Sequence, residues 1–153
     1  MRKGFKLYTE CSMTCTTRKA TQLGFACMIA GRSKTYSAFK MLSLRLWLEQ
    51  AIDHQQIQIF FDCTSNPIGY ITWANLAPDV EGRLLSDSQF FLDPAEWDEG
   101  EKTWIIDCCF IDGASVAVRA LKKIFVDQGI AKVYWARRNP DYSVKRIGSV
   151  KLV

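Results

Sequence analysis

Apolar positions recur along this chain at two different spacings, which predicts a mixed order of helices and strands. Helical spacing predicts one helix over residues 20–30, and a second that Ser37 caps and that runs to about residue 51. Alternation of apolar and polar residues then predicts strands over residues 56–62 and 68–74. A tight turn joins these two strands, so we expect them to form an antiparallel hairpin.

The second half of the chain repeats this mixture. We expect a short helix or two within residues 77–92, followed by a turn that Asp93 caps. Residues 103–110 form a strongly apolar strand in this interpretation. Residues 114–128 follow as an amphipathic helix, with Val118, Leu121, Ile124 and Phe125 expected on its inner face.

A further strand over residues 131–136 and a last strand or hairpin over residues 142–153 complete the order, with a basic turn beginning at Arg137 between them. The whole pattern predicts an α+β (mixed α/β) fold with a central, mostly antiparallel sheet flanked by helices. Residues 1–18 are polar and are expected to form a flexible N-terminal arm, which leaves residues 19–153 as a single domain.

Composition narrows the class of protein. Hydrophobic residues make up 48% of the 153 residues and charged residues 24%, as in an ordinary globular domain. No stretch has the length of a membrane span or the apolar core of a secretory signal, so we expect a cytoplasmic protein. The formal net charge of +4 favours an acidic partner or an anionic substrate. Nucleic acid is not expected, because the aromatic residues stand in apolar strands rather than between basic ones.

Asp107 is the first candidate for a catalytic residue. It stands between Trp104-Ile-Ile106 and Cys108-Cys109-Phe110, where an ionised carboxylate is costly to bury without a partner. Such groups concentrate at functional sites. The alternative is a structural one, in which Asp107 caps the helix that follows Gly113.

The six cysteines predict no metal site. Cys11 and Cys15 could face each other on one helical turn, but no second pair at ligand spacing follows, and the single histidine, His54, is remote. In a cytoplasmic chain the thiols are expected to be reduced. Cys108 or Cys109 could serve as a nucleophile beside the neighbouring carboxylate, although buried structural thiols are the commoner case.

Two segments together resemble strands of the RTX toxin-activating lysine-acyltransferases: Gly69-Tyr-Ile-Thr-Trp-Ala-Asn-Leu76 and Lys102-Thr-Trp-Ile-Ile-Asp107. That family has a Tyr-x-x-Trp-Ala-x-Leu strand and a Lys-x-Trp-x-x-Asp-like strand whose Asp is one half of its catalytic pair. The resemblance extends from about Leu23 to the C-terminus. It implies a fold like the Gcn5-type N-acetyltransferases and a catalytic role for Asp107. It also implies acyl carrier protein as the acyl donor.

The chain departs from that family at the second catalytic residue, which is a histidine before the first long helix. Counting without gaps from Leu23, or backwards from Ile52, places this position on Tyr36. An unperturbed tyrosine titrates about three units above a histidine. Tyr36 is therefore a poor general base unless its pKa is strongly lowered. It could instead donate a hydrogen bond to a substrate carbonyl, or simply pack against the sheet.

Other polar and aromatic residues are candidates for substrate binding. Two hydroxyls in the loop before Tyr36 could donate to an oxyanion or a phosphate, and an amide at a strand end could orient a carbonyl. Two adjacent arginines could clamp a phosphopantetheine or siderophore anion, and a strand tryptophan could stack on a ligand. Each has a plainer alternative as a solvated loop, a turn or a core residue. The two hydroxyls belong to Ser33 and Thr35, and the amide belongs to Asn75. The adjacent arginines are Arg137 and Arg138, and the tryptophan is Trp73.

Three functions are compatible with these residues. The missing histidine and the short chain favour a divergent family member that resembles a maturation protein of siderophore microcins. With a partner protein, it would attach a glycosylated catecholate siderophore to the peptide C-terminus. The alternatives are acyl carrier protein-dependent acylation of lysines in an RTX protoxin, and a non-catalytic pseudoenzyme scaffold. No tightly bound cofactor is expected, and the donor would be acyl carrier protein or an activated siderophore.

Overall fold

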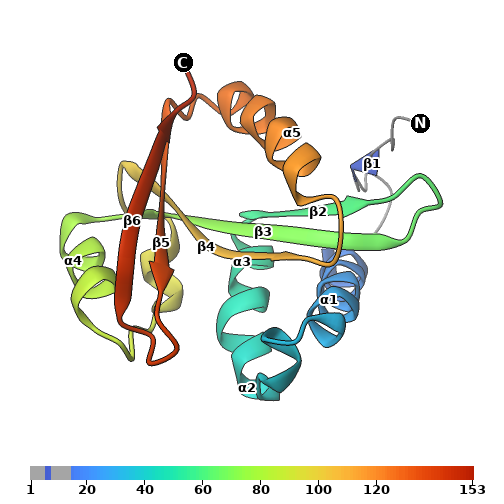
Figure 1. Ribbon diagram of the computed structural model, residues 1–153, viewed down its shortest axis with the longest axis horizontal. Coiled ribbons are helices and arrows are strands. Elements are labelled where there is room, and N and C mark those ends of the chain that lie inside the picture. Colours follow the sequence, from blue (N-terminus) through green and yellow to red (C-terminus); the bar gives the residue numbers. More distant parts are fainter. Residues whose placement is uncertain (1–5, 8–14) are drawn as a thin grey trace.

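Six strands form one sheet in the order of the sequence (Figure 1). The structure, a computed structural model, describes residues 6–7 and 15–153. All neighbouring strands are antiparallel except β4 and β5, which are parallel. The strands are β1 (Lys6–Leu7), β2 (Ile57–Phe61), β3 (Pro67–Leu76), β4 (Lys102–Phe110), β5 (Lys132–Arg138) and β6 (Val144–Lys151). The predicted mixed α/β fold with a mostly antiparallel sheet is confirmed.

Helices cover both faces of the sheet (Figure 1). The long helix is α1 (Cys15–Arg32), and α5 (Ala114–Asp127) lies on the other face. The shorter segments are η1 (Tyr36–Ala38), α2 (Met41–Ser43), η2 (Leu44–Leu48), α3 (Glu49–Asp53), α4 (Pro78–Ser86) and η3 (Pro94–Trp97). None of the helices within residues 15–153 is long and apolar enough to cross a membrane.

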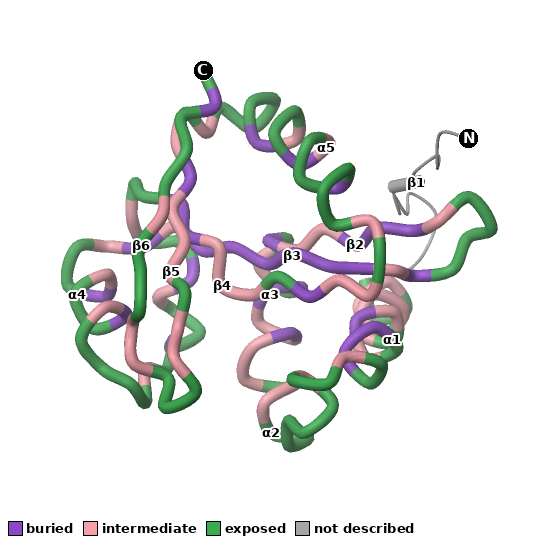
Figure 2. The backbone as a smooth tube through the Cα atoms, in the orientation of Figure 1, coloured by how far each residue is buried: buried purple, intermediate pink, exposed green. Residues whose placement is uncertain are grey.

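Alternating residues of the strands build the cores on the two faces. Ile59 and Tyr70 pack with Ala26 and Ile29 of α1, whereas Phe60 packs with the buried residues of α5. Buried backbone follows the length of β3, while β6 at the sheet edge is mostly exposed (Figure 2). This is the expected result of a two-residue side-chain period in strands that are covered on both faces.

The N-terminal boundary differs from the prediction. Helix α1 begins at Cys15, so residues 15–18, which were expected in the arm, form its first turn. Lys6 and Leu7 pair with β2, and the remaining arm residues lie outside the described part of the chain, as does Cys11. The other five cysteines are free thiols. Within the described residues no group of three or more His, Cys, Asp and Glu side chains could hold a metal ion.

The predicted second helix is the largest local error. Ser37 is not its cap but lies in the short 3-10 turn η1, and the chain then becomes extended at Phe39 before helical structure resumes at Met41. The segment η2 is a π-helix, in which the backbone N–H of Glu49 donates to the carbonyl of Leu44. This wider turn shifts the helical phase of the residues that follow. Leu42, whose apolar side chain contributed to the helical pattern, is 60% exposed.

Two smaller corrections concern the C-terminal half. Val118 on α5 is exposed rather than buried, and Ala117 takes its place in the core, because the buried stripe follows the spacing of Ala117, Leu121 and Phe125. Gly129 follows the C-cap of this helix with a positive φ. Arg137 and Arg138 belong to β5 and not to the following turn.

Candidate active site

A small pocket lies between the sheet and the helical segments that follow α1. It encloses about 270 Å³ of empty volume, part of it open to solvent, and its walls are largely apolar. Asp107 supplies the carboxylate, from β4. The other lining residues come from α1, from η1, α2 and η2, from the extended break at Phe39, and from β3. They are Ala30, Tyr36, Phe39, Ser43, Leu44, Trp47, Leu48 and Tyr70.

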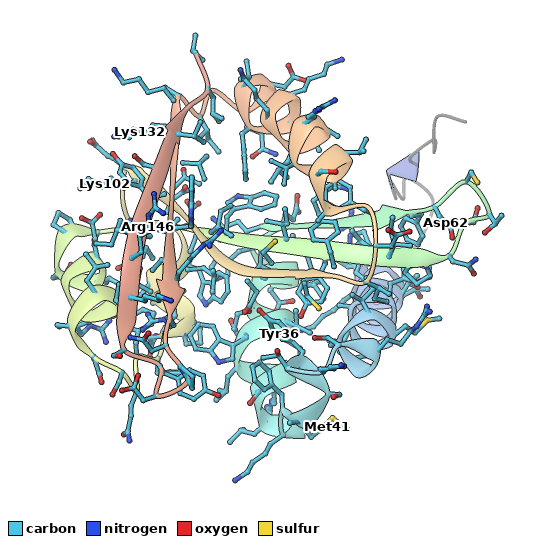
Figure 3. All side chains as sticks on the ribbon, viewed as in Figure 1. Tyr36, Met41, Asp62, Lys102, Lys132 and Arg146 are labelled. Atoms are coloured by element: carbon cyan, nitrogen blue, oxygen red, sulfur yellow. The ribbon has the colours of Figure 1, made fainter. Side chains whose placement is uncertain are left out.

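Asp107 and Tyr36 meet in this pocket although 71 positions separate them in the sequence. The Tyr36 hydroxyl donates to Asp107 Oδ1 at 3.0 Å. Figure 3 shows Tyr36 on the side of the sheet where α1 and α2 lie. Burial raises the pKa of Asp107 from 3.8 to about 6, against the opposing effect of the hydrogen bond from Tyr36. The carboxylate can therefore gain or lose a proton close to neutral pH.

A β-bulge turns the Asp107 side chain toward the pocket. Thr72 of β3 is opposite Asp107, but Trp73 is opposite Ile105, so Ile106 is an extra residue on β4. Ile105 packs on the α5 face, and Ile106 packs on the opposite face beside Trp104. Regular alternation would return Asp107 to the α5 face. The bulge places it on the α1 face instead.

Thr72 supports this geometry. Its side chain is fully buried, and its hydroxyl accepts a hydrogen bond from the Asp107 backbone N–H at 3.0 Å. A bulge disrupts the regular ladder, so a side chain that accepts from the strand N–H compensates part of the loss. Thr72 thereby fixes the backbone that carries the carboxylate.

Tyr36 does not have the properties of a general base. Burial raises its pKa far above the ordinary range, and the nearby charge of Asp107 adds to this effect. Tyr70, the other pocket tyrosine, has its pKa raised for the same two reasons. Both phenols are therefore protonated donors at neutral pH. Asp107 is the group that can accept a proton here.

The two hydroxyl candidates before Tyr36 have different positions. The Oγ of Ser33 accepts a hydrogen bond from the Tyr36 backbone N–H at 3.3 Å, so Ser33 helps to shape the turn that carries the phenol. Thr35 is exposed and is not among the residues that line the pocket. The structure brings Ser33 next to the catalytic candidates and leaves Thr35 at the surface.

Asn75 and Trp73 have structural partners away from the pocket. The Asn75 amide donates to Asp98 at 2.7 Å, and its carbonyl accepts from Thr103 at 2.7 Å. Trp73 is 3% exposed and packs edge-on against Phe125 of α5, with ring centroids 5.0 Å apart. It belongs to the core on the face opposite Asp107.

The arginine candidates are also separated from the pocket. Arg138 donates to the carbonyls of Tyr142 and Leu84, at 2.7 and 2.8 Å, so its guanidinium is occupied by protein groups. Arg137 is exposed on β5. His54 is the C-cap of α3, stacks on Trp97 and has its Nε2 2.9 Å from the Pro94 carbonyl oxygen.

Most residues of the pocket walls were not predicted from the sequence. Tyr70 could have been found, because it is the first residue of the Tyr-x-x-Trp-Ala-x-Leu segment; the strand register then places it opposite Cys109, two residues from Asp107. Thr72 offered a weaker signal as a polar residue in an apolar strand. Leu44, Trp47 and Leu48 gave none, because their direction depends on the π-helix.

The alternative in which Asp107 caps a helix is wrong. Asp107 lies within β4, and the N-cap of α5 is Gly113, in a left-handed conformation. The carboxylate therefore has no role at a helix terminus.

The fold is that of the GNAT acetyltransferases. The structure resembles a GNAT family acetyltransferase from Listeria monocytogenes 4b F2365, with a TM-score of 0.50 and 10% sequence identity over 89% of this chain and 78% of the other. At that identity the likeness concerns the fold alone. It confirms the acetyltransferase-like architecture expected from the sequence.

The chain belongs to the RTX toxin acyltransferase family, because residues 15–149 match the HlyC model of that family. It is 39% identical over 57 residues to the leukotoxin-activating lysine-acyltransferase LktC of a Pasteurella haemolytica-like species (strain 5943B). It is 37% identical over 57 residues to the serotype A1 LktC of Mannheimia haemolytica. Each match covers 37% of this chain and 33% of the relative, so the chain matches about a third of the length of each of these two curated proteins.

Proposed function

We propose that this protein transfers an acyl group from a carrier-bound thioester to a lysine of a protein substrate, with Asp107 as the general base. The observation that carries the proposal is the Asp107 carboxylate, held by the Tyr36 hydroxyl at 3.0 Å in a largely apolar pocket. Family membership supports acyl transfer, and the names of the two curated relatives support lysine as the acceptor and a toxin as the substrate.

The proposed chemistry needs only one proton acceptor on the protein. The neutral lysine amine attacks the thioester carbonyl, so that a C–N bond forms and the C–S bond breaks. The nitrogen becomes acidic as it attacks and gives its proton to ionised Asp107. Asp107 passes this proton to the departing sulfur, so the carrier leaves as the free thiol and the ionised base is restored. With a pKa of about 6, Asp107 is mostly ionised at neutral pH and ready to accept.

Tyr36 would then position the base instead of replacing the family histidine as a base. Its hydroxyl fixes one carboxylate oxygen and lowers the pKa of Asp107 relative to burial alone. This division of roles explains how the site could work without a histidine at this position.

The test is intact-mass analysis of candidate substrates after incubation with this protein and an acyl carrier protein that holds a fatty acyl group. We expect a fatty-acyl mass increment on a protein, mapped by fragmentation to a lysine. Attachment of a glycosylated catecholate siderophore to a microcin remains a prediction of the sequence, and a siderophore increment on a small peptide would replace our proposal with it. A stable substrate complex without any increment would favour the pseudoenzyme.

Replacing Tyr36 with Phe tests its role as a positioning residue. The rising limb of kcat/KM against pH, expected near pH 6 as Asp107 ionises, should move upward by about one to two pH units, because a hydrogen bond to a charged group contributes roughly 1.5–3 kcal/mol. Exposed Tyr142→Phe is the matched control and should leave the profile in place. Loss of transfer at every pH would show instead that the phenol itself takes part in the chemistry.

A further inference from the structure

The C-terminal hairpin, residues 132–151, carries an excess of positive charge; it comprises β5, β6 and the turn between them. This hairpin holds six of the twenty Lys and Arg residues but only one of the sixteen Asp and Glu residues, so the rest of the chain has fourteen cations against fifteen carboxylates. Figure 3 shows Arg146 and Lys132 on these strands. The hairpin is one of two cationic parts of the chain, since residues 11–48 hold six Lys and Arg residues and no Asp or Glu.

Most of these cations are not engaged by the protein. Arg138 is hydrogen-bonded to carbonyls, and Lys132 lies 4.7 Å above the Tyr134 ring. The single carboxylate of the hairpin, Asp141, accepts from the N–H and the hydroxyl of Ser143. Four exposed cations form no salt bridge within the described residues: Arg137, Lys145, Arg146 and Lys151.

Cations also stand directly opposite one another across the two strands. Arg137 is the register partner of Arg146, and Lys132 is the partner of Lys151. Like charges in such pairs are destabilising. Positive residues on an edge strand can protect it from pairing with other chains, but that role does not require matched cations on the neighbouring strand. An anionic partner would compensate for this arrangement.

The hairpin is adjacent to the strand that carries Asp107. β5 pairs with β4 only from Thr103 to Ile105, and the two strands then separate (Figure 1). Arg137 lies two residues beyond Trp135, the last β5 residue in that pairing. Three of the four free cations, Arg137, Lys145 and Arg146, therefore lie at the end of the hairpin where the strands diverge and β4 continues to the site, whereas Lys151 lies at the other end.

We propose that the β5–β6 hairpin is the docking surface for the acidic carrier protein that delivers the acyl thioester. This inference rests on the proposed function, since it names the surface that receives the donor. Complementary charge would steer the carrier to the hairpin and hold its thioester beside β4.

The aromatic residues of the hairpin do not suit nucleic acid. Tyr134 stacks on Trp104 at 5.3 Å and has Lys102 and Lys132 above its ring, and Trp135 covers Gly148, where an added Cβ would meet the indole. Bases bound in single strands need aromatic faces free for stacking. An acidic protein surface requires only the cations.

The test compares two double variants with the same change in charge. Arg137→Glu/Arg146→Glu reverses the opposed pair, and Lys122→Glu/Lys123→Glu reverses two exposed lysines of α5. With carrier-bound acyl donor, kcat/KM of the hairpin variant should fall roughly 10- to 100-fold, while the α5 variant stays near wild type. With acyl-pantetheine, which lacks the carrier, both variants should match wild type. Equal losses with the two donors, or no loss with the carrier, would overturn the proposal.

Direct binding separates this inference from the proposed function. If wild type acylates nothing, fluorescence anisotropy of a labelled carrier protein still tests docking. Binding that weakens with salt and is lost only in the hairpin variant would support it. No binding of the carrier by wild type, or preferential binding of duplex DNA or anionic vesicles, would overturn it.

Discussion

Replacing Asp107 with Asn is expected to reduce acyl transfer by about 100- to 10,000-fold, the usual contribution of a general base. The amide can still accept the hydrogen bond that Tyr36 donates at 3.0 Å, so the pocket should keep its shape while losing its proton acceptor. Single-turnover transfer from the carrier-bound donor measures the effect. Asp127→Asn, at an exposed position on α5, is the control and should be silent. Activity close to wild type would eliminate Asp107 as the base.

The same substitution should stabilise the fold at high pH. The pKa of Asp107 is raised from 3.8 to about 6 in the folded state, so the folded chain holds the proton more tightly. That favourable contribution is complete below about pH 4 and is lost as the pH rises from there through about 6, above which the full cost of ionising the buried group applies. At 1.36 kcal/mol per unit, Asp107→Asn should gain at most about 3 kcal/mol at about pH 8 and little at about pH 4.

Urea unfolding at the two pH values tests this expectation. Higher stability with lower activity would identify a carboxylate kept in the protein for function despite its cost. A variant that is less stable at both pH values would indicate that Asp107 mainly supports the structure.

Replacing Trp73 with Ala is expected to lower the free energy of unfolding by about 3–5 kcal/mol, the usual cost of removing a large buried aromatic side chain. Trp73 is 3% exposed and contacts Phe125 of α5, so its loss leaves a cavity between the sheet and that helix. Urea unfolding followed by circular dichroism measures this change.

Trp73→Phe distinguishes packing from substrate binding. It keeps an aromatic ring in the core and should retain KM, with a smaller loss of stability than Trp73→Ala. If Trp73→Phe raised KM for the acceptor without lowering the free energy of unfolding, the ring would belong to the binding site and not to the core.

Strand positions were predictable because they depend on local side-chain alternation. Ile57 and Ile59 in β2, and the apolar segment around Trp104, indicated buried strands without knowledge of their partners. The interval from Met41 to Asp53 was not predictable in this way. Its π-helix and the extended break before it change the phase of the side chains, and no simple apolar period describes them.

The site residues also divide into those that the sequence identified and those whose role only the folded chain decides. Asp107 was identifiable as a carboxylate in an apolar strand, and Tyr36 from its position relative to a family histidine. The substrate-binding candidates Asn75 and Arg138 were plausible from residue type, but each has protein partners that only the folded chain provides. A polar side chain does not reveal in the sequence which group will satisfy it.

The sequence by itself determined the order of elements, the buried strands, the acidic candidate and the charge of the C-terminal hairpin, because these follow from residue type and local period. Tertiary structure decided the rest. The bulge at Ile106 sets the face on which Asp107 lies, and strand register brings Thr72 to its backbone. Packing of α1 and η1 against the sheet places Tyr36 within hydrogen-bond distance. These relations join segments far apart in the chain, and local periodicity contains no information about them.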